Sequence, residues 1–330
     1  MSTPILFFIG TGFHTHTLDW LVESDCGGQG VRVQPTTYDA LFAAEHVAPG
    51  CYIFTDIERL SLYERRLAAS LFRAMADRRD LFVALNDPAR VRFRYALLRA
   101  LHEAGVNGFD AYRASGLPRP RRFPVFLKAE ADHGPALTDL LPDQAALDAA
   151  LTRLQASGEP LEGIAVIEYA GEPIAPGLWT RFTAFGVAGT ILPDLPVTER
   201  CWMVKSGELG LVDEAGYARH DAMIRQGYHA GVLARAFQLA GIGFGRADYG
   251  LVGGRPQIYE INTNPNMPGL EPPHPSALRQ ATRRFTWMRL TGALAALARQ
   301  APRGGAVTLD LPLIAQHRAR SGHAPMGWRP

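Results

Sequence analysis

The segment 245–262 constrains the fold more than any other part of the chain. Two runs of alternating apolar and polar residues flank a Gly-Gly pair, which is the pattern of a β-hairpin. A loop of three residues, Gly-Gly-Arg, pairs Asp248 with Glu260 across the hairpin. The same register pairs Arg246 with Asn262, so all four side chains project from one face. A loop of two residues would instead send Asp248 and Glu260 to opposite faces. We expect the first register.

The facing carboxylates of Asp248 and Glu260 predict a cation site. In the expected register their Cβ atoms lie about 5 Å apart, and two carboxylates so close repel unless a cation lies between them. With the amide oxygen of Asn262 they form hard oxygen ligands, which suit Mg²⁺ better than zinc or copper. The alternative is a pair of solvated acids on an exposed sheet. The run 262–266 argues against it, because three Asn and a Pro form a rigid polar corner after the strand.

The rest of the chain divides into two textures. Short apolar runs alternate with amphipathic stretches in the N-terminal third, which predicts a parallel sheet covered by helices, and connection lengths after residue 112 predict antiparallel strands. We expect strands at 5–10, 31–33, 51–54, 81–85, 123–128, 164–169, 180–187 and 190–192. We expect helices at 61–78, 91–105, 143–156, 221–240 and 276–299. The tail after Pro302 carries no pattern that we can assign.

Composition excludes several classes of function. The 34 basic and 32 acidic residues give a net charge of +2, too balanced for a nucleic-acid or membrane-surface protein. The apolar run 4–9 is too short to span a bilayer and lacks the basic flank of a signal peptide. Three scattered cysteines give neither a disulfide framework nor zinc-type spacing. We therefore expect a cytoplasmic globular protein that binds neither nucleic acid nor membranes.

Lysine is scarce in this sequence. Lys128 and Lys205 are the only lysines among 34 basic residues. An arbitrary surface cation in this chain would be Arg, so a retained Lys indicates a place that needs a compact ammonium rather than a planar fork. Phosphate oxygens in a crowded site are such a place.

The acidic hairpin resembles the metal-binding hairpin of the ATP-grasp superfamily. Asp248, Glu260 and Asn262 match its three ligand positions in type and spacing, within the run Glu-Ile-Asn-Thr-Asn-Pro. That superfamily includes D-alanine–D-alanine ligase, glutathione synthetase and peptide ligases. The resemblance implies that Asp248 binds one Mg²⁺, Glu260 bridges two and Asn262 completes the second, with Mn²⁺ as an alternative. Arg246 is also a usual family residue near the phosphates or the substrate.

The same resemblance implies where ATP contacts the chain. Lys128 ends a strand in the manner of the family lysine that reaches the phosphates, and Lys205 falls where D-alanine ligases hold a second one. Arg181 opens a strand at a phosphate- or substrate-facing position. The loop 129–136 would close over the phosphates, although it has one Gly where the family often has several.

The adenine would lie against a hinge strand similar to Ile-Glu-Tyr-Ala. Backbone groups of Tyr169 and Ala170 would pair with the adenine edge. Either Glu168 or Glu172 would meet the ribose, and the sequence does not choose between them.

The resemblance also implies an organisation that joins α/β and α+β architecture. A parallel-sheet pre-ATP-grasp domain is expected over 1–112, followed by a two-part ATP-grasp fold with a small subdomain over 113–170 and a large subdomain over 171–302. The remaining residues, 303–330, form a C-terminal tail.

The implied activity is ATP- and Mg²⁺-dependent ligation of a small-molecule carboxylate to an amine through an acylphosphate. Two alternatives stay open: an ATP-grasp kinase that phosphorylates a hydroxyl group, and a nucleotide-binding regulatory protein without turnover. A homodimer is an option that rests on analogy alone.

Other features carry weaker signals. The turn 10–12 could present backbone N–H groups to an anion, but the dinucleotide fingerprint is incomplete and a plain turn is the simpler interpretation. His14 and His16 are expected to be surface residues.

The acceptor substrate is expected between the N-terminal unit and the segment after Asn266, near His274 and Ser276. Trp179 and Trp202 are expected to be packing residues.

Overall fold

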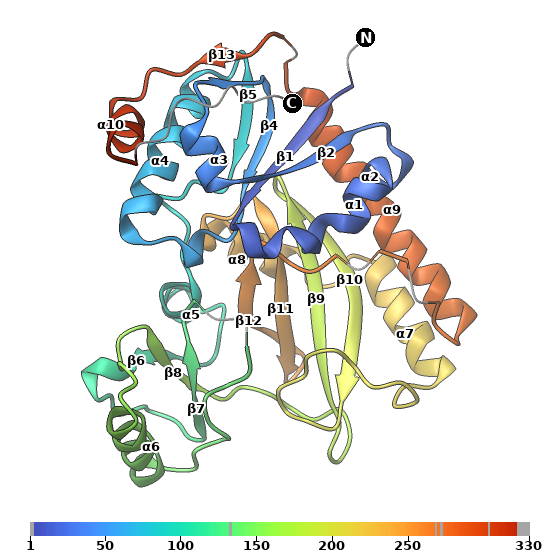
Figure 1. The fold of residues 1–330 in the computed structure, drawn as a ribbon. Coiled ribbons are helices and arrows are strands. Elements are labelled where there is room, and N and C mark those ends of the chain that lie inside the picture. The colour runs from blue at the N-terminus through green and yellow to red at the C-terminus, as the bar shows by residue number, and fades with distance from the viewer. Residues whose placement is uncertain (1–2, 132–133, 268, 271–272, 303, 322–330) are drawn as a thin grey trace.

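The first sheet is parallel, as the sequence predicts. The computed structural model describes residues 3–131, 134–267, 269–270, 273–302 and 304–321. The strand order is β2-β1-β4-β5, and helices lie on both faces of the sheet (Figure 1). The strands are β1 (Ile5–Gly10), β2 (Arg32–Thr37), β4 (Gly50–Phe54) and β5 (Phe82–Leu85). The surrounding helices are η1 (Gly12–Leu18), α1 (Asp19–Glu23), α2 (Asp25–Gly28), α3 (Tyr38–Ala43), η2 (Ile57–Arg59) and α4 (Leu62–Asp77).

Helix α4 shows how local sequence fixes these elements. Ser61 caps its N-terminus and forms a reciprocal capping box with Glu64, which satisfies backbone N–H groups that have no partner inside the helix. Leu67, Leu71 and Met75 recur at helical spacing and are buried, so they hold α4 against the core of this unit.

The large sheet is antiparallel, with the order β10-β9-β11-β12. Its strands are β9 (Trp179–Val187), β10 (Thr190–Glu199), β11 (Phe244–Val252) and β12 (Arg255–Asn262).

The expected loop of the acidic hairpin is wrong, although the expected facing pairs are present. Val252 pairs with Arg255, so the loop has two residues, both Gly with positive φ. The register then shifts by one residue at Tyr259, a β-bulge, and beyond it Asp248 lies opposite Glu260. Because side chains alternate along a strand, the two-residue loop alone would place Glu260 on the opposite face from Asp248. The extra residue returns Glu260 to the same face. Arg246 lies opposite residue 262, as expected.

A small antiparallel sheet, β6-β8-β7, forms a separate layer. Helix α6 (Gln144–Ala156) packs on it, and Leu147, Ala150 and Leu151 complete its apolar core. The strands are β6 (Ala111–Arg113), β7 (Val125–Ala129) and β8 (Ile164–Glu168), with a short helix η3 (Ala114–Gly116). Helix α5 (Arg94–Glu103) contacts both this sheet and β12 of the large sheet.

The helix expected over 221–240 is two helices. Helix α7 (Glu214–Arg225) begins earlier, where Asp213 accepts a hydrogen bond from the backbone N–H of Gly216. It ends before Gly227, whose φ is +67°, and α8 (Ala230–Ala240) starts after His229, which also has a positive φ. A glycine in the left-handed conformation is a common end of a helix, so Gly227 is the sequence signal for this break.

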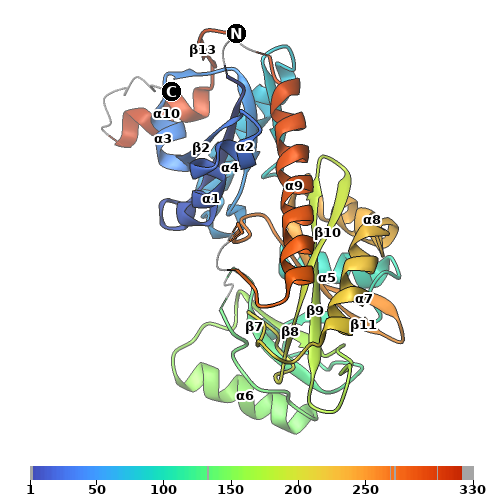
Figure 2. The ribbon, with the colours of Figure 1, turned by 90° about the vertical axis from the view of Figure 1, so that its right-hand side faces the viewer.

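Helix α9 (Ala277–Gln300) confirms the long helix expected over 276–299. It packs on β9 and β10 and also on β1 and β4, so it runs along two sheets (Figure 2).

The tail that the sequence left unassigned packs against the first unit, which is the parallel sheet with the helices around it. Strand β13 (Val307–Thr308) pairs with β3 (His46–Val47), and α10 (Pro312–Ser321) packs on α3 and α4. Ile314 is buried there.

Asn86 joins the first sheet to the large sheet. Its side-chain amide donates to the carbonyl oxygens of Phe54 and Phe244, and its oxygen accepts from the N–H groups of Gly243 and Phe244. These bonds satisfy buried backbone groups on two elements at once.

In the described part of the chain, no helix has the length and apolar character needed to cross a membrane.

Candidate nucleotide and metal site

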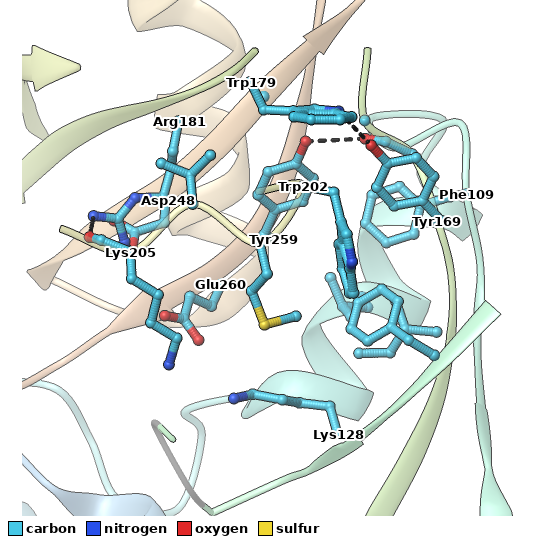
Figure 3. Close-up of a pocket in the computed structure, with 18 of the residues that line it drawn as sticks. Phe109, Lys128, Tyr169, Trp179, Arg181, Trp202, Lys205, Asp248, Tyr259 and Glu260 are labelled. Atoms are coloured by element: carbon cyan, nitrogen blue, oxygen red, sulfur yellow. Dashed lines mark hydrogen bonds and ion pairs between the residues drawn. The ribbon is translucent and has the colours of Figure 1, made fainter. Parts of the chain in front are cut away.

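One pocket of about 270 Å³ gathers every residue that the sequence singled out for the site. It lies between the small sheet and the hairpin of the large sheet, and Figure 3 shows charged groups toward one side and aromatic rings toward the other. The predicted residues in its wall are Lys128, Glu168, Tyr169, Ala170, Glu172, Arg181, Lys205, Arg246, Asp248, Glu260 and Asn262.

Asp248 is the buried centre of the charged side. Its carboxylate accepts hydrogen bonds from Arg181 Nη1 at 2.5 Å and from Arg246 Nε at 3.1 Å. Only 4% of its side chain is exposed, so both arginines act as its counterions where water screens little. Burial acts to lower the pKa of Arg246, but the carboxylate of Asp248, with those of Asp194 and Glu260, raises it.

Glu260 pairs with a residue that the site prediction did not include. Arg94 Nη2 lies 2.6 Å from Glu260 Oε2, and only 8% of the Arg94 side chain is exposed. Arg94 comes from the start of α5, which was predicted as a helix, but nothing in the local sequence indicates a partner so distant along the chain.

The donor set fits Mg²⁺. Asp248 and Glu260 face each other on adjacent strands, and Asn262 follows on the same face as Glu260. The described residues contain no cluster of three His, Cys, Asp or Glu side chains. A cation here would therefore need the Asn262 amide and oxygen ligands from outside the chain, which is how Mg²⁺ is held beside substrate phosphates.

Hydrogen bonds through Asn264 connect the Asn262 side chain to the first unit. Its Oδ1 accepts from the backbone N–H of Asn264 at 2.8 Å. The Asn264 amide donates to Asp56 Oδ2 at 3.0 Å and its Oδ1 accepts from Thr17 at 2.7 Å. Asp56, which is buried, also accepts from Thr11 Oγ1 at 2.9 Å. A chain of hydrogen bonds thus links the carboxyl ends of β1 and β4 to the hairpin.

In the turn at residues 10–12, Thr11 therefore already bonds to a carboxylate of the same chain. The Thr11 backbone N–H donates to Asp56 at 3.2 Å, so the N–H group that could have met a ligand meets a carboxylate of the same chain. His16 is exposed, and the side chain of His14 lies outside the described residues.

The two lysines converge on one carbonyl oxygen. Lys128 Nζ donates to the carbonyls of Gly134 and Pro135, and Lys205 Nζ donates to Gly134 O at 2.6 Å. Lys128 is only 5% exposed, whereas Lys205 is exposed. Two ammonium groups around one neutral oxygen indicate a place that favours a more negative ligand. In the expected closing loop, residues 132 and 133 lie outside the described residues.

Trp179 and Trp202, expected as packing residues, also line the aromatic side of the pocket. Trp179 Nε1 donates to the Tyr169 hydroxyl at 2.9 Å. The Trp202 ring meets the Tyr169 ring edge-on, with 5.5 Å between the ring centroids, and its centroid lies 5.0 Å from that of Phe126. These rings all line the pocket, and burial raises the pKa of Tyr169. The bulge residue Tyr259 adds a further wall, with its hydroxyl bonded to Ala170 O at 2.9 Å.

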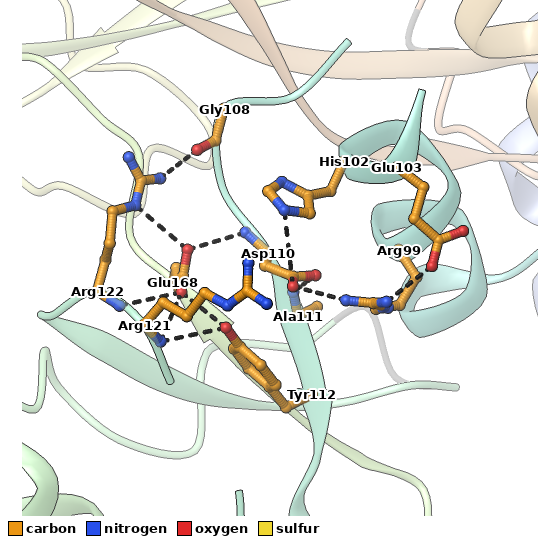
Figure 4. A network of polar contacts seen from close by, with 10 residues as sticks. All are labelled: Arg99, His102, Glu103, Gly108, Asp110, Ala111, Tyr112, Arg121, Arg122 and Glu168. Atoms are coloured by element: carbon orange, nitrogen blue, oxygen red, sulfur yellow. Dashed lines mark hydrogen bonds and ion pairs between the residues drawn. The ribbon is translucent and has the colours of Figure 1, made fainter. Parts of the chain in front are cut away.

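Glu168 and Glu172, which the sequence could not distinguish, have different surroundings. The Glu168 carboxylate is 3% exposed and forms the centre of the network in Figure 4. It accepts hydrogen bonds from the backbone of Asp110, Arg121 and Arg122, from the Tyr112 hydroxyl and from Arg122 Nε. Glu172 is exposed, and one oxygen accepts from Gly253 N–H at 2.7 Å. Glu168 therefore fixes the segment that contains Arg121 and Arg122, whereas Glu172 keeps an exposed carboxylate at the pocket wall.

Solved structures resemble the whole of this architecture. D-alanine–D-alanine ligase from Bacillus anthracis, complexed with ATP, superposes with a TM-score of 0.50 at 11% identity, over 91% of this chain and 98% of that one. The ATP-grasp ligase PsnB, complexed with a minimal precursor, gives a TM-score of 0.52 at 13% identity, over 90% and 99%. The chain has the ATP-grasp fold. No family model matches the sequence, and no curated protein does.

Within the ATP-grasp fold, the described pocket occupies the junction of the small sheet and the large sheet. The likeness establishes the fold, and the roles of individual residues rest on the geometry of this chain.

The network around Glu168 leads to a prediction about stability. Glu168→Gln keeps the shape but replaces one acceptor oxygen by an NH2 group, a donor that faces other donors. It should therefore lower the free energy of unfolding by about 2–4 kcal/mol. Urea unfolding followed by circular dichroism measures this change. Glu172→Gln, the matched exposed substitution, should cost less than about 1 kcal/mol. Equal losses in the two variants would contradict the assignment of Glu168 to a structural role.

Proposed function

We propose that the protein is an ATP- and Mg²⁺-dependent ligase that joins a carboxylate to an amine through an acylphosphate. One observation carries the proposal: the hairpin sets Asp248, Glu260 and Asn262 on one face, in the same pocket as both lysines. An oxygen-donor set beside paired ammonium groups is suited to a metal-bound triphosphate. The likeness to a ligase complexed with ATP and to an ATP-grasp ligase complexed with a minimal precursor supports this choice.

The nucleotide would lie along the length of the pocket. Its adenine would enter the aromatic side, against Tyr169, Trp179 and Trp202, with the backbone of Ala170 at its edge. The exposed carboxylate of Glu172 would meet the ribose.

The triphosphate would lie at the charged side. Lys128 and Lys205 would exchange the Gly134 carbonyl for phosphate oxygens. Asp248, Glu260 and Asn262 would hold one or two Mg²⁺ ions. The metal would neutralise negative charge on the β- and γ-phosphates.

The chemistry asks the protein for positioning and charge rather than for a base. A carboxylate oxygen of the acid attacks the γ-phosphorus, the bond to ADP breaks, and an acylphosphate forms. The amine nitrogen then attacks the carbonyl carbon and loses a proton as phosphate leaves. Arg181 and Arg246, fixed by Asp248, would stabilise the negative oxygens of both steps.

Hydroxylamine can test the reaction without knowledge of the amine. In a screen of carboxylic acids with ATP, Mg²⁺ and hydroxylamine, an accepted acid should give ADP and a hydroxamate in equal amounts, because hydroxylamine intercepts an acylphosphate. Coupled ADP detection and the coloured ferric hydroxamate complex measure the two products. A phosphorylated hydroxyl compound without hydroxamate would indicate a kinase. ATP binding without ADP formation for any acid or hydroxyl compound would indicate a regulatory protein.

The metal assignment is tested by Glu260→Gln. This substitution keeps the size but removes one charge from the cation site, so Mg²⁺-dependent ADP formation should fall at least about 100-fold. Binding of Mn²⁺ in the presence of ADP, followed by electron paramagnetic resonance, should weaken in parallel. Glu103→Gln, at an exposed acid on α5, is the control. Unchanged turnover in the Glu260 variant would exclude the metal role.

Replacement of either lysine by arginine tests why lysine is retained. Lys128→Arg and Lys205→Arg keep the charge, but the wide guanidinium does not fit the shared position near Gly134. Each should weaken binding of Mg²⁺-ATP about tenfold or more in isothermal titration calorimetry. Arg153→Lys, on the exposed face of α6, should leave the affinity unchanged. Wild-type affinity in both lysine variants would remove the phosphate role from these residues.

A further inference from the structure

A second pocket of about 470 Å³ adjoins the first at its charged side. Arg181, Lys205, Arg246 and Asn266 line both pockets. The second pocket is therefore continuous with the place proposed for the transferring phosphoryl group. Its other walls come from β9, β10, α9 and the segment after β12.

The far wall of the second pocket carries two arginines of α9 that have no role in the proposed nucleotide site. Arg279 and Arg283 lie one helical turn apart, so they present adjacent guanidinium groups to the pocket. Asp194 is the only acidic residue in the described wall. Two neighbouring cations with one carboxylate leave the wall positive.

The hydrogen bonds of Arg279 are incomplete. Its Nη2 donates to Pro196 O at 2.5 Å, but the described residues offer no partner to its buried Nη1. The Nε of Arg283 donates to Gly269 O at 2.8 Å. Burial, with the nearby charge of Arg283, lowers the pKa of Arg279 against the opposing effect of Asp194. A buried donor without a partner is costly, and an anionic ligand would supply the missing acceptor.

Apolar side chains also line the second pocket. They include Phe185, Leu192, Leu290 and the half-buried Trp287. His274 also lines the pocket, as expected, but its Nδ1 accepts from Ser276 N–H at 3.0 Å. Ser276 itself is buried as the cap of α9 and lies outside the described wall of this pocket.

We propose that this second pocket binds a substrate that has an apolar segment and carries, besides its reacting group, a carboxylate held by Arg279 and Arg283. The proposal rests on the proposed function, because that function places the reacting group at Arg181 and Arg246. The additional carboxylate belongs either to the acid, which is then a dicarboxylate, or to the amine, which is then an amino acid. Apolar contact with Trp287 favours a substrate with a hydrocarbon chain or ring.

Matched probes test the pocket by direct binding, without any turnover. Suberate and phenylalanine carry the proposed carboxylate, whereas octanoate and phenethylamine are their counterparts without it. In calorimetry with the wild-type protein, at least one carboxylate-bearing probe should bind about tenfold or more tightly than its counterpart. Preference for suberate assigns the carboxylate to the acid, and preference for phenylalanine assigns it to the amine. No preference in either pair, or no binding of either carboxylate-bearing probe, would overturn the proposal.

Variants of α9 locate the binding group. Arg279→Met and Arg283→Met should each weaken the preferred probe about 10- to 100-fold and should leave Mg²⁺-ATP affinity unchanged. Arg279→Lys should restore part of the lost affinity. Arg284→Met, an exposed arginine on the same helix, is the matched control. Because Arg279 also bonds Pro196 O, Arg283→Met provides a test that does not disturb that contact. Wild-type probe affinity in both Met variants would overturn the assignment.

The two proposals can fail separately. Selective binding of a carboxylate-bearing probe with no ADP formation from any acid would leave this pocket in place and refute the ligase. Hydroxamate formation with equal use of suberate and octanoate, and equal use of phenylalanine and phenethylamine when each replaces hydroxylamine, would leave the ligase in place and refute this pocket.

Discussion

The repulsion between Asp248 and Glu260 is the constraint on which the rest of the site depends. Facing carboxylates in a poorly hydrated place require cations, and the fold supplies them from three elements: Arg181 on β9, Arg246 on β11 and Arg94 on α5. The arginines on β9 and β11 also form the boundary between the two pockets. The charge balance of the hairpin thereby joins α5 to the large sheet.

The bulge at Tyr259 gives this arrangement its geometry. Without the extra residue, the two-residue Gly-Gly turn would place Glu260 on the opposite face from Asp248. With it, the carboxylates share a face, and the ring of Tyr259 joins the aromatic wall of the same pocket. One inserted residue therefore adjusts the charged side and adds a ring to the aromatic side.

Sequence alone predicted the parallel and antiparallel sheets, α9 and the facing acids of the hairpin, because hydrophobic alternation and spacing are local properties. The resemblance to the ATP-grasp superfamily supplied most of the other residues that line the first pocket. It missed the bulge, because alternation around a hairpin reads the same for a three-residue loop as for a two-residue loop with an insertion. The Arg94–Glu260 pair and the network of Glu168 join distant segments, and no local pattern encodes such contacts. The short pairing of β13 with β3 carries too few residues to show any period.

The hydrogen-bond chain from Asp56 through Asn264 to Asn262 would link the first unit thermodynamically to the proposed cation site. The orientation of the Asn262 amide depends on how Thr17 and Asp56 sit against the large sheet. By reciprocity, a cation that favours this orientation tightens the contact between the two units, and a ligand that tightens the contact raises the affinity for the cation by the same factor. The first unit would thus take part in the proposed cation site, even though none of its carboxylates is an expected cation ligand.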